Sequence, residues 1–212
     1  MTARPTLRIG VTGHRLNRLA AARCDAVRDA LAGLFDVLGR GAEAGRLELL
    51  SPLAEGSDRL AAEAMPPGWR LTVLLPMAAA EYERDFLKPG ETESASLAAF
   101  RALCASAVSV TALPPIAGAD PRSRAGRDLS YAALGARLVR EVDLLVAVWN
   151  GRPAEGPGGT AGVVEEAVDL GVPVLRIDPD LPAAPPTRVS FDGRRPSFEP
   201  ADPTALAASL KA

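Results

Sequence analysis

The sequence contains little of several residue types on which common protein functions depend. Of its 212 residues, two are cysteines, one is a histidine and 4% are aromatic. Cys24 and Cys104 lie far apart, so neither a disulfide framework nor a zinc cluster is expected. Because His14 is the only histidine, multi-histidine metal centres are excluded, and we expect no metal site. The low aromatic content also argues against a stacking platform for single-stranded nucleic acid.

The chain also lacks an excess of charge of one sign and a long apolar run. Lys and Arg number 24 against 26 Asp and Glu, which gives a net charge of −2. Dedicated nucleic-acid binders usually carry a basic excess, so we predict that nucleic acid is not the ligand. The longest apolar run, at 71–80, contains Pro76 and is about half the ~20 residues that a membrane span needs. Residues 1–12 have no apolar segment of signal-peptide length. We therefore expect a cytoplasmic protein with no membrane partner.

A regular alternation of apolar runs and amphipathic segments is present instead. Short apolar runs predict strands at 7–12, 47–51, 71–75, 107–113, 144–149 and 172–177. The segments between them predict helices at 15–38, 57–65, 78–87, 94–104, 129–142 and 160–170. This order predicts an α/β fold, a single Rossmann-like doubly wound domain whose mostly parallel sheet has helices on both faces.

The domain is expected to cover residues 1–180. A Pro-rich C-terminal extension at 181–212, with an edge strand at 188–191 and a short helix from 204, is expected to pack on the same domain. The segment 114–128 has no helical or strand period and is rich in Pro, Gly and Arg, so we expect a mobile loop there.

In doubly wound sheets, ligands bind beyond the carboxyl ends of the strands. That rule selects the loops at 12–15, 51–59, 76–82, 113–128 and 150–160. These loops contain glycines, hydroxyl groups and charged side chains that suit a phosphate or a sugar. The predicted ligand-binding residues in and beside them are Gly10, Thr12, Gly13, His14 and Arg15; Ser51, Glu55, Gly56 and Asp58; Asn150, Gly158, Gly159 and Thr160.

Two of these loops have the features of an anion site. Glycines between a strand and a helix let backbone N–H groups face a phosphate, and the helix N-terminus adds a partial positive charge. This applies after the first strand, where Arg15 adds a planar guanidinium, and at Gly158-Gly159-Thr160. Glu55 is the candidate for ribose hydroxyls. Asp58 and Glu165 each have a second interpretation, as acidic residues that stabilise the first turns of a helix.

Four segments together resemble the SLOG superfamily. They are Val-Thr-Gly-His-Arg at 11–15, Ser-Pro-Leu-Ala-Glu-Gly-Ser-Asp-Arg at 51–59, the apolar strand at 71–76, and the run from 142 to Gly-Gly-Thr at 158–160. The superfamily groups the DNA-processing protein A family, the Lonely Guy family and the sensor domains of melastatin-type channels. The resemblance spans 7–177 and implies a Rossmann-like domain that binds a nucleotide or nucleotide-derived ligand.

Each of the first two families resembles one part of the chain. The segment 51–59 is similar to a motif of DNA-processing protein A, a family that binds single-stranded DNA. The Lonely Guy family cleaves the N-glycosidic bond of nucleoside 5′-monophosphates, and its signature matches Pro157, Gly158 and Gly159. The same resemblance puts Glu165 at the position of that family's catalytic glutamate.

Two functions follow as hypotheses. The first is a sensor of a nucleoside phosphate or an ADP-ribose-like ligand in a bacterial stress or defence pathway, which would require an effector protein as partner. The alternative is an N-glycosidic hydrolase in which Glu165, or Glu55 as a second candidate, stabilises the sugar cation. Resemblance to the family also implies a homodimer. No cofactor is expected in either case.

Overall fold

The centre of the protein is a mostly parallel β-sheet. The structure is a computed structural model, and it describes residues 6–40, 46–154 and 156–211. Within these residues, eight strands form one sheet in the order β4-β3-β2-β1-β5-β6-β7-β8. The strands are β1 (Leu7–Gly13), β2 (Leu47–Ser51), β3 (Arg70–Leu75), β4 (Ser109–Ala112), β5 (Leu144–Val148), β6 (Val174–Ile177), β7 (Thr187–Asp192) and β8 (Arg195–Pro200).

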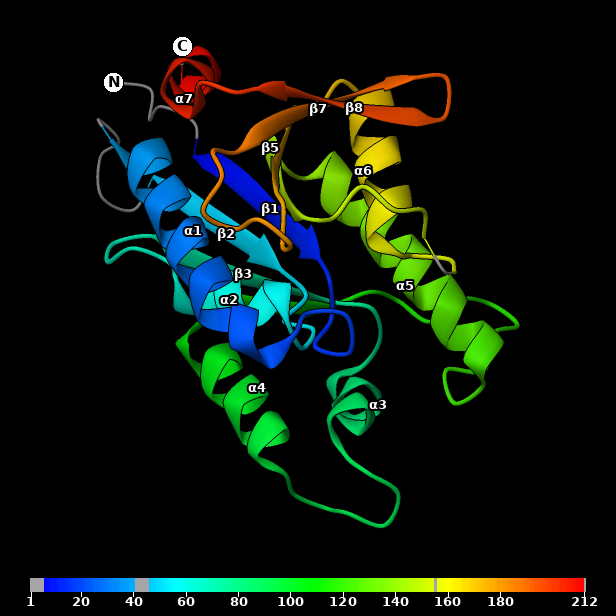
Figure 1. The fold of residues 1–212 in the computed structure, drawn as a ribbon. Helices are drawn as coiled ribbons and strands as arrows, with labels where there is room; N and C mark the ends of the chain where they lie inside the picture. Colours follow the sequence, from blue (N-terminus) through cyan, green and yellow to red (C-terminus); the bar gives the residue numbers. More distant parts are fainter. Residues whose placement is uncertain (1–5, 41–45, 155, 212) are drawn as a thin grey trace, which may run out of the picture.

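Helices connect the strands and cover both faces of the sheet, as Figure 1 shows. The helices are α1 (Ala21–Gly39), α2 (Ser57–Glu63), α3 (Ala79–Tyr82), the short 3₁₀ helix η1 (Glu83–Phe86), α4 (Ala95–Ser106), α5 (Arg124–Arg140), α6 (Thr160–Asp169) and α7 (Pro203–Lys211). Strands β1 to β6 are paired in parallel, whereas β7 pairs antiparallel with β6 and β8. The predicted fold class, a Rossmann-like doubly wound domain, is confirmed.

The two faces of the sheet bury two separate hydrophobic clusters. Successive strand residues point to opposite faces, so Val146 of β5 packs towards α1 and α2, while Leu145 packs towards α5 and α6. Phe35 of α1 is fully buried on the first face, and Val164 of α6 is fully buried on the second. Because β5 is covered on both faces, it consists entirely of apolar residues.

The strand order reverses direction at β1. From β1 the chain winds outward through β2, β3 and β4 on one side and through β5 and β6 on the other. Loops from the two halves separate at this point, which leaves a crevice beyond the carboxyl ends of β1 and β5. The position of the functional site therefore follows from the topology.

Two helices begin several residues away from their predicted starts. The first helix begins at Ala21 rather than at residue 15, because residues 14–20 form turns in which the Leu19 N–H donates to the Arg15 carbonyl at 3.0 Å. The fifth helix begins at Arg124, since the Ser123 hydroxyl caps it by accepting from the Gly126 N–H at 3.0 Å. The last five residues of the expected loop at 114–128 are therefore helical.

The C-terminal residues continue the same sheet. β7 contains the strand expected at 188–191, and Ala207 of α7 is buried in the cluster on the α1 face. β8 was not predicted, because it contains Pro196 and Pro200; an edge strand tolerates proline, since its outer N–H groups need no partner in the sheet. Among the described residues, no helix is long and apolar enough to cross a membrane.

Candidate ligand site

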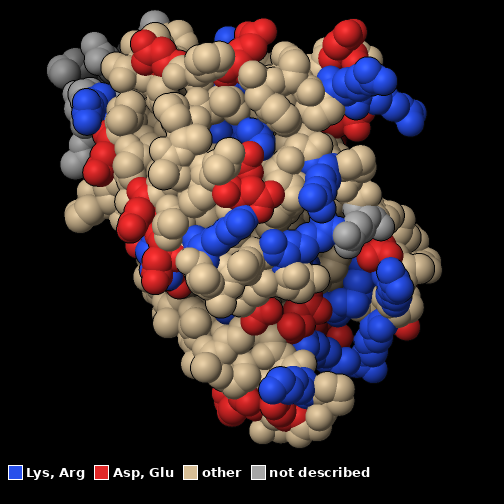
Figure 2. All heavy atoms as spheres, in the orientation of Figure 1, with Lys and Arg blue, Asp and Glu red and all other residues tan. Residues whose placement is uncertain are grey.

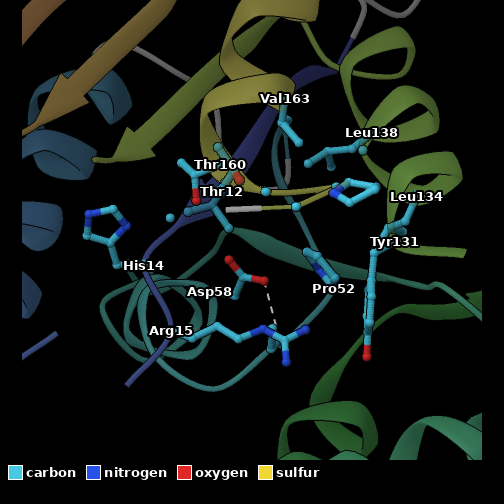
Figure 3. A pocket seen from close by; sticks show the side chains of 18 of the residues that line it. Thr12, His14, Arg15, Pro52, Asp58, Tyr131, Leu134, Leu138, Thr160 and Val163 are labelled. Carbon is cyan, nitrogen blue, oxygen red and sulfur yellow. Dashed lines mark hydrogen bonds between the residues drawn. The ribbon is translucent and has the colours of Figure 1, made fainter. Parts of the chain in front are cut away.

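A cavity of about 330 Å³ lies beyond the carboxyl end of β1, between the loop that follows β2 and the connection from β5 to α6. Its lining comes from residues 11–18, the loop at 52–58, Tyr82, the inner side of α5 and the segment 156–163 that begins α6. Figure 3 shows side chains from these elements converging on one space. Of the predicted residues, the lining includes Thr12, Gly13, His14, Arg15, Asp58, Gly158, Gly159 and Thr160.

Close contact between the first two loops fixes one wall of the cavity. The His14 carbonyl accepts hydrogen bonds from the Ser57 N–H at 3.1 Å and the Ser57 hydroxyl at 2.9 Å. A Cβ on Gly56, whose φ is +99°, would lie 2.5 Å from the same carbonyl oxygen. A Cβ on Gly13 would lie 2.6 Å from the Ser57 side chain. Both positions therefore require glycine so that the two loops can approach.

The loop before α2 contains a residue in a strained conformation. Leu53 has a φ of 56°, in the left-handed region that leucine rarely adopts. Its N–H donates to the Ser51 hydroxyl at 3.1 Å, and its carbonyl accepts from Arg59 Nε at 3.0 Å. Such strain persists only where surrounding contacts hold it, and it is concentrated at functional sites.

The start of α6 faces the cavity from the opposite side. Gly158 has a φ of +71°, and a Cβ there would lie 2.6 Å from the carbonyl carbon of Tyr131 on α5. Thr160 is the first helical residue, and the Gly159 carbonyl accepts from the Gly162 N–H at 3.0 Å. The first N–H groups of a helix have no partners within it and carry its partial positive charge. This arrangement can hold an anion.

Arg15 lies at the rim of the cavity, against α5. Its guanidinium carbon is 4.9 Å from the centre of the Tyr131 ring, a cation–π geometry. The Tyr131 hydroxyl in turn donates to Asp85, and Arg127 also pairs with Asp85. The Arg15 guanidinium is therefore positioned by an aromatic ring that is itself held in place.

Asp58 is the buried charged group of the cavity. It is 6% exposed, and its carboxylate accepts from the Ala54 N–H at 3.3 Å. Burial raises the pKa of Asp58 to about 7, although the Ala54 hydrogen bond and the charges of Arg15 and Arg59 act in the opposite direction. A carboxyl group with a strongly shifted pKa inside a cavity is typical of a functional site.

Two buried polar atoms in the lining, unlike the Asp58 carboxylate, have no hydrogen-bond partner among the described residues. They are Nε2 of His14 and the hydroxyl of Tyr82, both buried. Burial lowers the pKa of His14, against an opposing hydrogen bond with Asn150, and raises that of Tyr82 well above its ordinary value. Figure 3 shows the His14 ring turned away from Asp58.

Several predicted residues do not line the cavity. Glu165 is exposed on α6, and Glu55 accepts a hydrogen bond from the Ser96 hydroxyl. The structure therefore brings neither proposed catalytic carboxylate into the cavity. Gly10 lies against the side chain of Val142. Ser51 and Gly56 make the contacts described above, which hold the loop before α2 in place. The side-chain oxygen of Asn150 accepts from the Arg152 N–H at 3.2 Å in the loop after β5.

Sequence reasoning missed the apolar wall of the cavity. Tyr131, Leu134 and Leu138 lie on one side of α5, where a helical stripe is indistinguishable from ordinary core residues. Pro52 and Tyr82 belong to two of the loops that the strand-end rule selects. The position of these two residues in strand-end loops was a signal that could have identified them as part of the site. Their residue types gave no further indication of it.

Comparisons with known proteins identify the fold. No family model matches the chain, and no curated protein matches it. A solved structure of DNA processing protein A from Helicobacter pylori matches with a TM-score of 0.50 and 14% identity, over 82% of this chain and 66% of that one. The chain shares the fold of this protein, which is the fold that the resemblance to the SLOG superfamily implies. It spans slightly less than two thirds of the Helicobacter pylori protein, which was described for its binding of single-stranded DNA.

A second structure with lower similarity is TM1055, a structural genomics target. Its TM-score is 0.43 at 16% identity, over 79% of this chain and 72% of that one.

Proposed function

We propose that this SLOG-like chain binds a nucleotide or nucleotide-derived ligand, a nucleoside phosphate or an ADP-ribose-like molecule, and acts as its sensor. One observation carries the proposal. A single cavity at the strand-order reversal combines an anion-binding helix start, at Gly158-Gly159-Thr160, with an apolar wall on α5. Its volume of about 330 Å³ falls in the range of small-molecule sites.

Two sources of positive potential face the cavity, from opposite sides of Asp58. The N-terminus of α6 supplies backbone N–H groups, and Arg15 supplies a guanidinium with the planar donor geometry that suits phosphate oxygens. Because Arg15 lies at the rim, it can meet a phosphate that enters from solvent.

The other end suits a base. Pro52, Tyr131 and Leu134 line it, and Figure 3 shows these side chains on the side of the cavity towards α5. A flat heterocycle gains from contact with such a surface, and a tyrosine ring also favours stacking.

A sensor is favoured over the hydrolase because the carboxylate on which the hydrolase hypothesis depends is elsewhere. Glu165 lies on the exposed side of α6, and its neighbour Glu166 pairs with Arg140 at 3.1 Å. The effector protein, the homodimer and the bacterial stress or defence pathway stay predictions.

Single-stranded DNA is the competing ligand. The similar protein from Helicobacter pylori binds it, so net charge alone does not support the exclusion of nucleic acid made from the sequence. Figure 2 shows Lys and Arg side chains gathered over the N-terminal end of α5, where Arg122, Arg124 and Arg127 lie. A DNA oligonucleotide therefore belongs in the test.

The test combines thermal melting with chromatography of the ligand. AMP, ADP, ATP, NAD, ADP-ribose, cyclic ADP-ribose and a single-stranded oligonucleotide are each added to the purified chain. A ligand at 100 times its Kd should stabilise the fold by about 2.7 kcal/mol, which raises the Tm by roughly 5–10 °C at this size. We expect such a shift with at least one mononucleotide or ADP-ribose compound, recovered unchanged.

Variants then locate the binding. Arg15→Ala should weaken affinity roughly tenfold to a hundredfold, as expected for loss of a charge-assisted hydrogen bond. Arg137→Ala is the matched control, because Arg137 lies on α5 outside the cavity and pairs with Glu141. Stabilisation by the oligonucleotide alone would contradict the proposal, and release of free base would establish the hydrolase instead.

A further inference from the structure

We infer that Asp58 accepts hydrogen bonds from the sugar hydroxyls of the ligand, and that the site therefore selects ribonucleotides over 2′-deoxyribonucleotides. The inference rests on the proposed function and adds to it a specificity-determining residue and a narrower ligand class.

The carboxylate of Asp58 is placed to meet a ligand. Asp58 is the second residue of α2, in the connection that follows β2, and Figure 3 shows its carboxylate directed into the cavity between Thr12 and Arg15. The residue is 6% exposed, so this carboxylate is nearly removed from bulk water.

The protein leaves most of the acceptor capacity of this carboxylate unused. An ionised carboxylate has about four lone-pair sites, and the carboxylate of Asp58 accepts a hydrogen bond from the Ala54 N–H. Among the residues that the structure describes, no Lys or Arg nitrogen lies within ion-pairing distance of Asp58. Buried polar groups are nearly always satisfied, so this one is suited to donors that a ligand brings.

Neighbouring charges select the kind of donor. Arg15 and Arg59 both act electrostatically on Asp58 and would repel a cationic group bound beside it. A neutral group with several hydroxyl donors meets no such repulsion. A ribose has two adjacent hydroxyls, which match the two oxygens of one carboxylate.

The position between the two ends of the cavity also favours the sugar. Thr12 and Thr160 line the cavity on the side of the anion-binding helix start, and the apolar wall of α5 lines it on another side. In a nucleotide, the sugar joins the phosphate to the base. A carboxylate that follows the second strand is also where doubly wound sheets commonly contact a ribose hydroxyl.

Glu55 does not compete for this role. Its carboxylate accepts from the Ser96 hydroxyl, and it is not part of the cavity lining. The inference therefore assigns to Asp58 the sugar contact that the sequence suggested for Glu55.

Calorimetric titration with paired ligands tests the inference. The 5′-monophosphates of adenosine, guanosine, cytidine and uridine are each compared with their 2′-deoxy forms on the unmodified chain. We expect the bound ribonucleotide to be preferred by about tenfold to a hundredfold, the range for hydrogen bonds to a charged group. This comparison needs no variant and is independent of how any variant folds.

Asp58→Asn then assigns the preference to one side chain. It should reduce the preference to roughly threefold or less, since the amide has fewer acceptor sites. Asp29→Asn, on the exposed side of α1, is the control and should keep the full preference. Equal affinity for both sugars, or a preference that survives Asp58→Asn, would overturn the inference and leave the proposed function standing. If none of these monophosphates binds, and none of the compounds in the melting test binds either, both the proposed function and this inference fail.

Discussion

Replacement of Asp58 by asparagine should change how the stability of the protein depends on pH. The folded state raises the pKa of Asp58 from 3.8 to about 7, mainly through burial. The folded protein therefore disfavours the ionised form more than the unfolded chain does. Ionisation of Asp58 consequently reduces stability progressively as the pH rises from about 4 to about 7.

The size of this effect follows from the pKa difference. A tenfold change in a protonation equilibrium is worth about 1.4 kcal/mol, so the unmodified protein should lose about 4 kcal/mol through this one group. The asparagine side chain is neutral at every pH and retains an oxygen to accept the Ala54 N–H. The stability of Asp58→Asn relative to the unmodified chain should therefore rise by about 4 kcal/mol between pH 4 and pH 8.

Urea unfolding at pH 4, 6 and 8 measures this difference directly, because every other titrating group cancels between the two proteins. Asp29→Asn provides the baseline, since Asp29 is exposed on α1. A stability difference for Asp58→Asn that stays constant with pH would show that the Asp58 carboxyl is not held in a desolvated position, and the reasoning about its burial would be refuted.

Three further substitutions test separate parts of the structure. Gly158→Ala should destabilise the fold by about 2 kcal/mol or more, measured by urea unfolding, because it combines a positive φ with a Cβ 2.6 Å from the Tyr131 backbone; an unchanged midpoint would contradict the packing. Glu165→Gln should leave both ligand affinity and Tm unchanged, since exposed substitutions alter stability by less than about 0.5 kcal/mol; loss of binding in titration would return Glu165 to the site. Phe198→Ala should reduce stability by about 1 kcal/mol and alter tryptophan fluorescence, because its ring lies 5.9 Å from that of Trp149; identical spectra and midpoints would argue against that contact.

Much of the fold was predictable from local sequence pattern. Parallel strands that are buried on both faces consist of apolar runs, and the segments at 71–75 and 144–149 show this plainly. Boundaries were harder where tertiary contacts decide them. The amphipathic pattern from residue 15 continues through turns up to Ala21, and Arg124 begins a helix in a segment whose composition indicates a loop.

The candidate site was predictable in its loops and not in its details. Strand-end position located Arg15, Asp58 and Gly158 before the structure placed them on one cavity. Which of two nearby carboxylates faces inward depends on the turn at Leu53 and on a partner 41 residues away, since Ser96 binds Glu55. A pattern along the chain does not contain that information.

Hydrogen exchange in the presence of ligand tests the central claim most directly, because it reports where a nucleotide binds. With the mononucleotide or ADP-ribose compound that gives the largest melting shift, we predict slower exchange at residues 12–18, 52–58 and 156–163, the three segments that line the cavity from β1, β2 and α6. Protection confined to other parts of the sheet, or to the basic N-terminal end of α5, would contradict a nucleotide site in this cavity.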